Sequence, residues 1–129
     1  MLNLYFYLYL ITLHFIGDWL LQSHWMAINK SKDNVALLYH TGVYSATLLL
    51  GLVAAKLLLP SLMLFSAFQL LKFVGVNFVL HTVTDYFTSR CTSALWAKQD
   101  WHNFFAAIGA DQLIHYLTLA ITFVLILAS

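Results

Sequence analysis

The chain has 129 residues, of which 62% are hydrophobic and only 9% are charged, and its mean hydropathy is +0.82. An ordinary soluble domain carries about a quarter charged residues, so this composition is that of a membrane protein. A net charge of +1 gives no basic field for nucleic acid, and the single cysteine, Cys91, excludes an internal disulfide and a thiolate zinc site.

Four apolar runs follow one another along the chain, and a spanning helix needs about 20 such residues. We expect spans at residues 4–22, 35–56, 62–86 and 104–128, because strand-like alternation is absent and helices satisfy their own backbone groups in hydrocarbon. Lys72 lies inside the third run, so that span could instead start near Phe73 after an interfacial helix. The sequence predicts an all-α polytopic membrane protein, a single domain built as a bundle of about four transmembrane helices.

The first run lacks the basic start and the small-residue cleavage site of a signal peptide, so we interpret it as a span. Two connections, at residues 23–34 and 87–103, hold most of the polar residues. They carry four of the six basic residues, Lys30, Lys32, Arg90 and Lys98. The positive-inside bias therefore places both connections in the cytoplasm and both termini in the periplasm. All four tryptophans lie in or beside these connections: Trp19, Trp25, Trp96 and Trp101. They form either an aromatic belt at the headgroup level or a lid over a site.

Three His–Asp pairs with a spacing of four residues are the main sign of function. They are His14 with Asp18, His81 with Asp85, and Asp111 with His115, and His40 begins the second span. This spacing puts both side chains of a pair on one face of a helix. Ionisable groups inside apolar runs are costly, face the bundle interior and usually mark function. All seven groups fall in one leaflet, where a helical bundle can bring them together.

Imidazole and carboxylate ligands suit zinc, manganese, iron or nickel, and seven ligands exceed the three or four that one zinc ion uses. We therefore predict a site for one or two divalent ions, made by His14, Asp18, His40, His81, Asp85, Asp111 and His115. The alternative is that each pair is a hydrogen-bonded couple that holds helices together without metal. We further expect hydrogen bonds to the ligands from Gln22, Asn77 and Gln112, and close helix approach at Gly17, Gly42, Gly75 and Gly109.

Four stretches at the helix ends carry a family resemblance: HFIGDWLLQSHWMAINK at 14–30, the segment from His40 to Tyr44, HTVTDYFTSR at 81–90, and DQLIHYL at 111–117. Here the sequence resembles the domain-of-unknown-function family 3307, which consists of small bacterial and phage membrane proteins. The resemblance implies a bacterial or phage inner-membrane protein and brings no established activity. The first HxxxD pattern also resembles that of some membrane-bound metal-dependent hydrolases.

Three functions remain open at this point. The first is a metal-dependent hydrolase at the cytoplasmic leaflet, acting on a lipid-linked or phosphorylated substrate. Its catalytic ligand or base would be Asp18, Asp85 or Asp111, and its substrate would contact Lys30, Arg90 and Gln112. The second is a metal-ion or proton transporter, for which the outer leaflet offers few polar groups unless the chain forms a homo-oligomer. The third is a phage or bacterial interaction protein with a structural polar cluster.

Overall fold

The computed structural model describes residues 4–129, and these residues form helices and contain no strand. Helix α1 (Leu4–Phe15) continues into a π-helical turn, η1 (Ile16–Leu20), and the short helix α2 (His24–Asn29) follows. The long helices are α3 (Asn34–Leu58), α4 (Ala67–Ala97) and α5 (Trp101–Thr122), and α5 ends in a second π turn, η2 (Phe123–Leu127).

The prediction of an all-α membrane protein is confirmed. Three segments are long and apolar enough to cross a membrane, namely α3, α4 and the continuous segment Trp101–Leu127, and Leu4–Leu20 is a shorter apolar helix. The exposed surface of these helices is rich in Leu, Val and Phe, as expected for side chains that face lipid.

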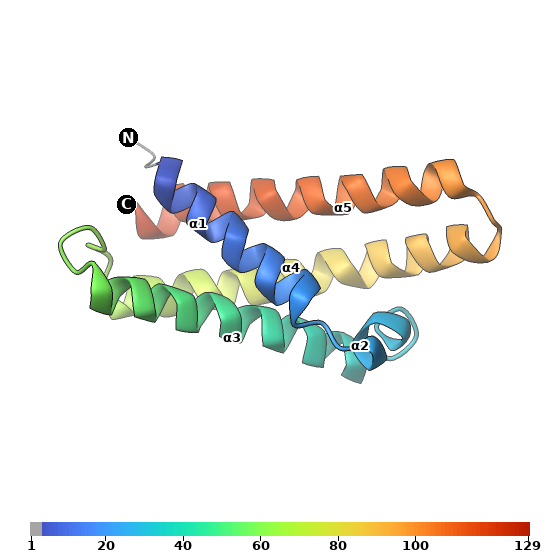
Figure 1. Cartoon of the computed structure of the whole chain (residues 1–129), viewed down its shortest axis with the longest axis horizontal. Coiled ribbons are helices and arrows are strands. Elements are labelled where there is room, and N and C mark those ends of the chain that lie inside the picture. The colour runs from blue at the N-terminus through green and yellow to red at the C-terminus, as the bar shows by residue number, and fades with distance from the viewer. Residues whose placement is uncertain (1–3) are drawn as a thin grey trace.

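The three long helices run side by side along the long axis of the molecule, and α1 crosses them obliquely (Figure 1). Both described ends of the chain lie at the same end of the bundle as the α3–α4 connection. Helix α2 and the α4–α5 turn lie at the opposite end. The two connections that carry most of the basic residues therefore share one end of the bundle, which we call the α2 end.

Helix α4, which corresponds to the third predicted span, differs from the prediction. It begins at Ala67 rather than at residue 62, and it continues to Ala97 through most of the predicted connection 87–103. The polar residues there do not end the helix, and side chains such as Thr88 and Arg90 hydrogen-bond to carbonyl oxygens four residues earlier within it. A drop in hydropathy marks where a helix leaves hydrocarbon, and not where it stops.

Local signals fix the ends of the helices. Ser66 and Gln69 form a reciprocal capping box at the start of α4, and Asp33 and Asp100 cap α3 and α5. The turn between α4 and α5 passes through Gln99, whose φ of 57° is left-handed. At 1.5 Å per residue, α4 is about 46 Å long between its ends at Ala67 and Ala97, which exceeds the hydrocarbon thickness of about 30 Å.

The apolar core fills the half of the bundle away from α2. It includes Leu10, Leu48, Leu52, Phe73 and Leu119, none of which has solvent exposure. Beyond it, toward the α2 end, the buried side chains become polar. Asp85 lies about 27 Å along α4 from Ala67, so the distance from the start of α4 to this polar layer is close to the hydrocarbon thickness of about 30 Å.

Candidate metal centre

Seven ionisable side chains from five helical elements meet in this polar layer. His14 comes from α1, Asp18 from η1, His40 from α3, His81 and Asp85 from α4, and Asp111 and His115 from α5. Six of them are buried, and Asp111 is 16% exposed. These are the seven residues that the sequence analysis named, six of them from their spacing and His40 from its place at the start of the second span.

Asp18, His40, His81 and Asp85 form the first group, in which each residue offers one ligand atom to a shared centre. The carboxylate oxygen Oδ1 of Asp18 lies 3.0 Å from His40 Nε2 and 3.2 Å from His81 Nε2. The two Nε2 atoms are 3.4 Å apart. Asp85 completes the group, with Oδ2 3.1 Å from His40 Nε2 and Oδ1 3.5 Å from His81 Nε2.

These distances match the edges of a metal coordination shell. Bonds of 2.0–2.1 Å to zinc in a tetrahedral site place neighbouring ligand atoms about 3.3 Å apart. Hydrogen bonding describes the group less well, because an imidazole Nε2 carries at most one proton and His40 Nε2 has several polar neighbours. Asp18 Oδ1 also lacks an aligned hydrogen bond from any residue of 4–129, although two imidazole nitrogens lie within 3.2 Å of it.

Asp85, Asp111 and His115 form a second group beside the first. His115 Nε2 lies 3.0 Å from Asp85 Oδ1 and 3.4 Å from Asp111 Oδ1. Asp85 belongs to both groups, with Oδ2 directed at His40 and Oδ1 at His115. A carboxylate shared in this way is suited to bridging two metal ions, which lie about 3.5–4 Å apart in binuclear sites.

The π turn η1 brings Asp18 to the cluster. Such turns are frequent at functional sites. Gly17 packs directly on α3, where a Cβ atom would lie 3.1 Å from Tyr44 Cα and 3.1 Å from Thr47 Cβ. The missing side chain therefore lets η1 approach α3 closely enough for Asp18 to reach His40.

Gln112 links two carboxylates of the cluster, those of Asp18 and Asp111. Its amide nitrogen donates to Asp18 Oδ2 at 3.2 Å and to Asp111 Oδ2 at 3.1 Å, and its carbonyl oxygen lies 3.2 Å from His14 Nε2. Thr88 donates a hydrogen bond of 2.6 Å to the other oxygen of Asp111. These contacts hold Asp18 by Oδ2, which leaves its Oδ1 directed at the imidazoles, and they hold Asp111 by both oxygens.

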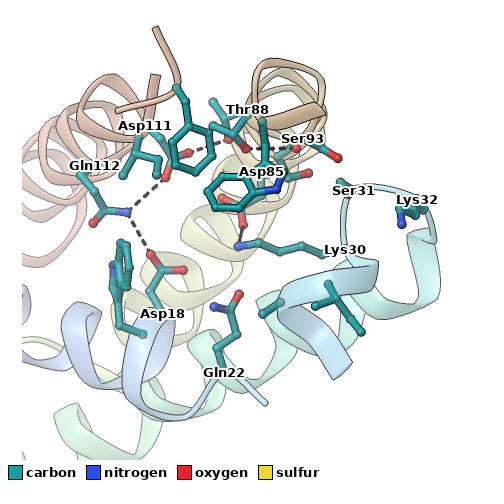
Figure 2. Close-up of a pocket in the computed structure, with 18 residues that line it drawn as sticks. Asp18, Gln22, Lys30, Ser31, Lys32, Asp85, Thr88, Ser93, Asp111 and Gln112 are labelled. Atoms are coloured by element: carbon teal, nitrogen blue, oxygen red, sulfur yellow. Dashed lines mark hydrogen bonds and ion pairs between the residues drawn. The ribbon is translucent and has the colours of Figure 1, made fainter. Parts of the chain in front are cut away.

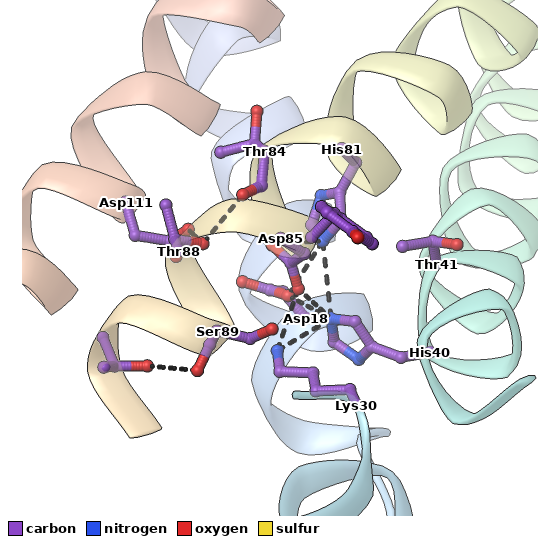
Figure 3. A network of polar contacts seen from close by, with 12 residues as sticks. Asp18, Lys30, His40, Thr41, His81, Thr84, Asp85, Thr88, Ser89 and Asp111 are labelled. Atoms are coloured by element: carbon purple, nitrogen blue, oxygen red, sulfur yellow. Dashed lines mark hydrogen bonds and ion pairs between the residues drawn. The ribbon is translucent and has the colours of Figure 1, made fainter. Parts of the chain in front are cut away.

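Lys30 enters the cluster from the α2–α3 connection (Figure 3). Its Nζ donates to Asp85 Oδ2 at 2.9 Å and lies 3.2 Å from His40 Nε2. His40 Nε2 thus faces Lys30 and the carboxylates of Asp18 and Asp85 together, so this nitrogen is directed into the cluster, as a metal ligand requires.

A cavity of about 600 Å³ lies over the cluster at the α2 end and is half open. Asp18, Asp85 and Asp111 line one side of it (Figure 2). Lys30, Ser31 and Lys32 come from the α2–α3 connection, and α4 contributes a row of hydroxyl side chains: Thr88, Ser89, Thr92 and Ser93. Apolar and aromatic side chains also line it, including Trp19, Ile28, Trp96, Phe104 and Ile108.

The family model for proteins of unknown function called DUF3307 matches residues 6–129. The chain belongs to the DUF3307 family. The matched range contains every residue of the cluster and of the cavity. No curated protein and no solved structure matches the chain. The DUF3307 match confirms the family resemblance of the sequence and leaves the function to be inferred from the site.

Some residues of this DUF3307 protein lie elsewhere than the sequence suggested. Arg90 does not line the cavity, because its guanidinium stacks on Tyr86 and donates to Asn34 Oδ1. Asn77 bonds to Thr122 in the apolar half rather than to a ligand. Three glycines expected at close helix contacts have nothing within 4 Å of the position that a Cβ atom would take: Gly42, Gly75 and Gly109.

The cavity residues Lys32, Ser89 and Thr88 were missed by the sequence reasoning. All of them lie in segments taken as connections, where polar residues are expected in any case. Only the continuation of α4 to Ala97 shows that its hydroxyl side chains form one wall. Trp19 and Trp96 line the cavity, whereas Trp25 and Trp101 do not.

Proposed function

We propose that this protein is a divalent-metal-dependent hydrolase that acts at the membrane surface, on the cytoplasmic side, on a lipid-linked or phosphorylated substrate. The observation that carries the proposal is the buried convergence of Asp18, His40, His81 and Asp85 beneath a half-open cavity. A second metal fits beside the first, held by Asp85, Asp111 and His115.

The charge of the cluster supports metal binding. If the imidazoles are neutral, Asp18, Asp85 and Asp111 contribute three negative charges and Lys30 contributes one positive charge. The net charge of the buried site is then −2. Burying unbalanced charge costs several kcal/mol per ion. One divalent cation neutralises this excess, and the remaining carboxylate oxygens and imidazoles are placed to coordinate it.

The residues divide naturally into ligands and a base. Asp18 and Asp85 are the more deeply buried carboxylates, so we assign them as ligands, together with His40, His81 and His115. Asp111 is a ligand only where a second ion is bound. With a single ion in the first group, Asp111 is the more exposed carboxylate that lines the cavity, and it can accept a proton from a water molecule beside the substrate. Bound metal would polarise the scissile bond and acidify that water. His14 lies outside both metal groups and orients Asp18 from 3.4 Å.

A hydrolase accounts for the wider structure better than a transporter does. The cavity is lined by residues of α2, the α2–α3 connection and the parts of α4 and α5 near the α2 end, so it lies on that side of the cluster. Within the described part of the chain, the core on the other side of the cluster is filled by fully buried side chains such as Leu48, Phe73 and Leu119. A substrate can reach the metal through the cavity, whereas an ion would find no path through this core.

Metal content is the direct test. The protein is purified without chelator or metal-binding tag, supplemented in turn with zinc, manganese, iron and nickel, and analysed for bound metal. We expect one or two ions per chain in the wild type, and a loss of metal in Asp85→Asn, which removes the shared ligand charge. Asp100→Asn is the matched control, because Asp100 caps α5 far from the cluster and Asn caps helices equally well.

Wild-type protein that holds no metal after supplementation would refute the metal centre. Metal retained at the wild-type level in Asp85→Asn would remove Asp85 from the ligands. Release of phosphate or of an acyl group from lipid substrates by wild type, but not by Asp111→Asn with its metal still bound, would then establish hydrolysis. Equal metal content and equal hydrolysis in Asp111→Asn would refute its role as base.

A further inference from the structure

The cavity is also lined by groups that are not among the proposed metal ligands. Lys30 and Lys32 come from the α2–α3 connection, and Ser89 comes from α4. We propose that Lys30, Lys32 and Ser89 form a binding site for the phosphate group of the substrate, next to the metal. This assignment rests on the proposed function, since it defines which substrates the metal centre would meet.

Ser89 is the independent sign of a ligand. It is 8% exposed and lines the cavity, and its Oγ atom has no hydrogen-bond partner among residues 4–129. Leaving a buried hydroxyl unpaired costs about 1–3 kcal/mol, whereas a hydroxyl that lines the cavity can donate to a phosphate oxygen. Its neighbour Thr88 is already engaged with Asp111, whereas the buried Ser89 hydroxyl is available to a ligand.

Metal binding would release Lys30 for this task. The Nζ atom lies within 3.2 Å of both Asp85 Oδ2 and His40 Nε2, which are two of the proposed ligand atoms. A divalent cation bonded to both atoms would repel an ammonium group at that distance. The long side chain must then turn away, and it already lines the cavity that lies beside it.

The charge of the cavity makes phosphate binding depend on metal. Three carboxylates and two lysines line it, which gives a net charge of −1 and repels anions. One divalent ion changes this balance to +1, and two ions change it to +3. Phosphate carries the complementary charge, and Lys is a common phosphate ligand in proteins. Anion binding is therefore expected only in the metal-loaded protein.

The rest of the lining indicates that the substrate has an apolar part as well. Ile28, Trp96, Phe104 and Ile108 share the cavity with the charged groups. Its volume of about 600 Å³ lies in the range of small-molecule sites, about 300–1,000 Å³. Two kinds of substrate would supply the phosphate group, namely a membrane lipid with a phosphate headgroup and a soluble phosphorylated compound. The experiment below distinguishes them.

Calorimetric titration in maltoside micelles, which contain no phosphate, tests the proposal. The probes are inorganic phosphate and a short-chain phosphatidic acid, each added to metal-loaded and to metal-free protein. We expect binding only with metal, and affinity lower by about tenfold or more in Ser89→Ala and in Lys32→Gln at unchanged metal content. Lys98→Gln, at an exposed lysine outside the cavity, is the control and should bind like the wild type.

Binding of phosphatidic acid alone would support a lipid headgroup as the source, and binding of both probes would support recognition of the phosphate group itself. Metal-loaded wild type that binds neither probe would overturn the phosphate site and leave the metal centre standing. Binding that is the same without metal, or the same in Ser89→Ala and Lys32→Gln, would also overturn it. Protein that holds no metal at all would instead refute the proposed function, and the phosphate site with it.

Discussion

Gly17→Ala tests whether the close approach of η1 to α3 is what positions Asp18. A Cβ atom at residue 17 would lie 3.1 Å from Tyr44 Cα and from Thr47 Cβ, whereas carbon atoms prefer separations of about 3.5–4.0 Å. The Tyr44 Cα atom belongs to the backbone of α3 and cannot rotate out of the way. The turn η1 must therefore move away from α3 by roughly half an ångström to relieve the contact.

This shift is large compared with the tolerance of a metal site. Asp18 Oδ1 lies 3.0 Å from His40 Nε2 and 3.2 Å from His81 Nε2, and ligand distances must hold to about 0.2 Å. We expect metal affinity to fall by about tenfold or more, which corresponds to about 1.4 kcal/mol. The crowded contact should also lower the free energy of unfolding by about 1–3 kcal/mol.

Competition with a chromogenic chelator measures the metal affinity, and thermal unfolding in the same detergent measures stability. Gly109→Ala is the matched control, because a Cβ atom on α5 at that position meets nothing within 4 Å. Alanine is the better helix former, so this control should keep its affinity and gain about 0.5–1 kcal/mol of stability. Wild-type affinity in Gly17→Ala would refute the reasoning.

Two further predictions follow from the site and from the charge pattern. Gln112→Ala should lower metal affinity about 10- to 100-fold, because Asp18 and Asp111 lose the amide that holds them. The control is Gln69→Ala, at the opposite end of the bundle, which should leave the affinity unchanged. Equal affinities in the wild type and both variants would exclude Gln112 as an orienting residue. Ser31→Cys in the α2–α3 connection should be protected from an impermeant thiol reagent in intact cells, and Ser129→Cys should react, both in a Cys91→Ser background; labelling of the cysteine at residue 31 would invert the topology.

The sequence by itself determined the class of the protein and the members of the polar cluster. Apolar runs of membrane-spanning length can satisfy their backbones only as helices, so composition was enough for the fold class. The pairs His14–Asp18, His81–Asp85 and Asp111–His115 could be recognised because a spacing of four residues is local geometry, and charge in an apolar run is conspicuous. Local rules of this kind need no knowledge of how the helices pack.

The tertiary structure decided which of these groups face one another. Asp85 lies between His40 and His115, and this bridging position depends on how α3 and α5 pack against α4, which no spacing within one helix encodes. Packing also distinguished Gly17, which contacts α3, from glycines such as Gly42 that face open space. The same holds for the polar residues beyond Tyr86. Their composition indicated only that the chain leaves hydrocarbon, whereas the continuation of α4 makes Ser89 part of a wall, because a cavity is formed by several segments at once.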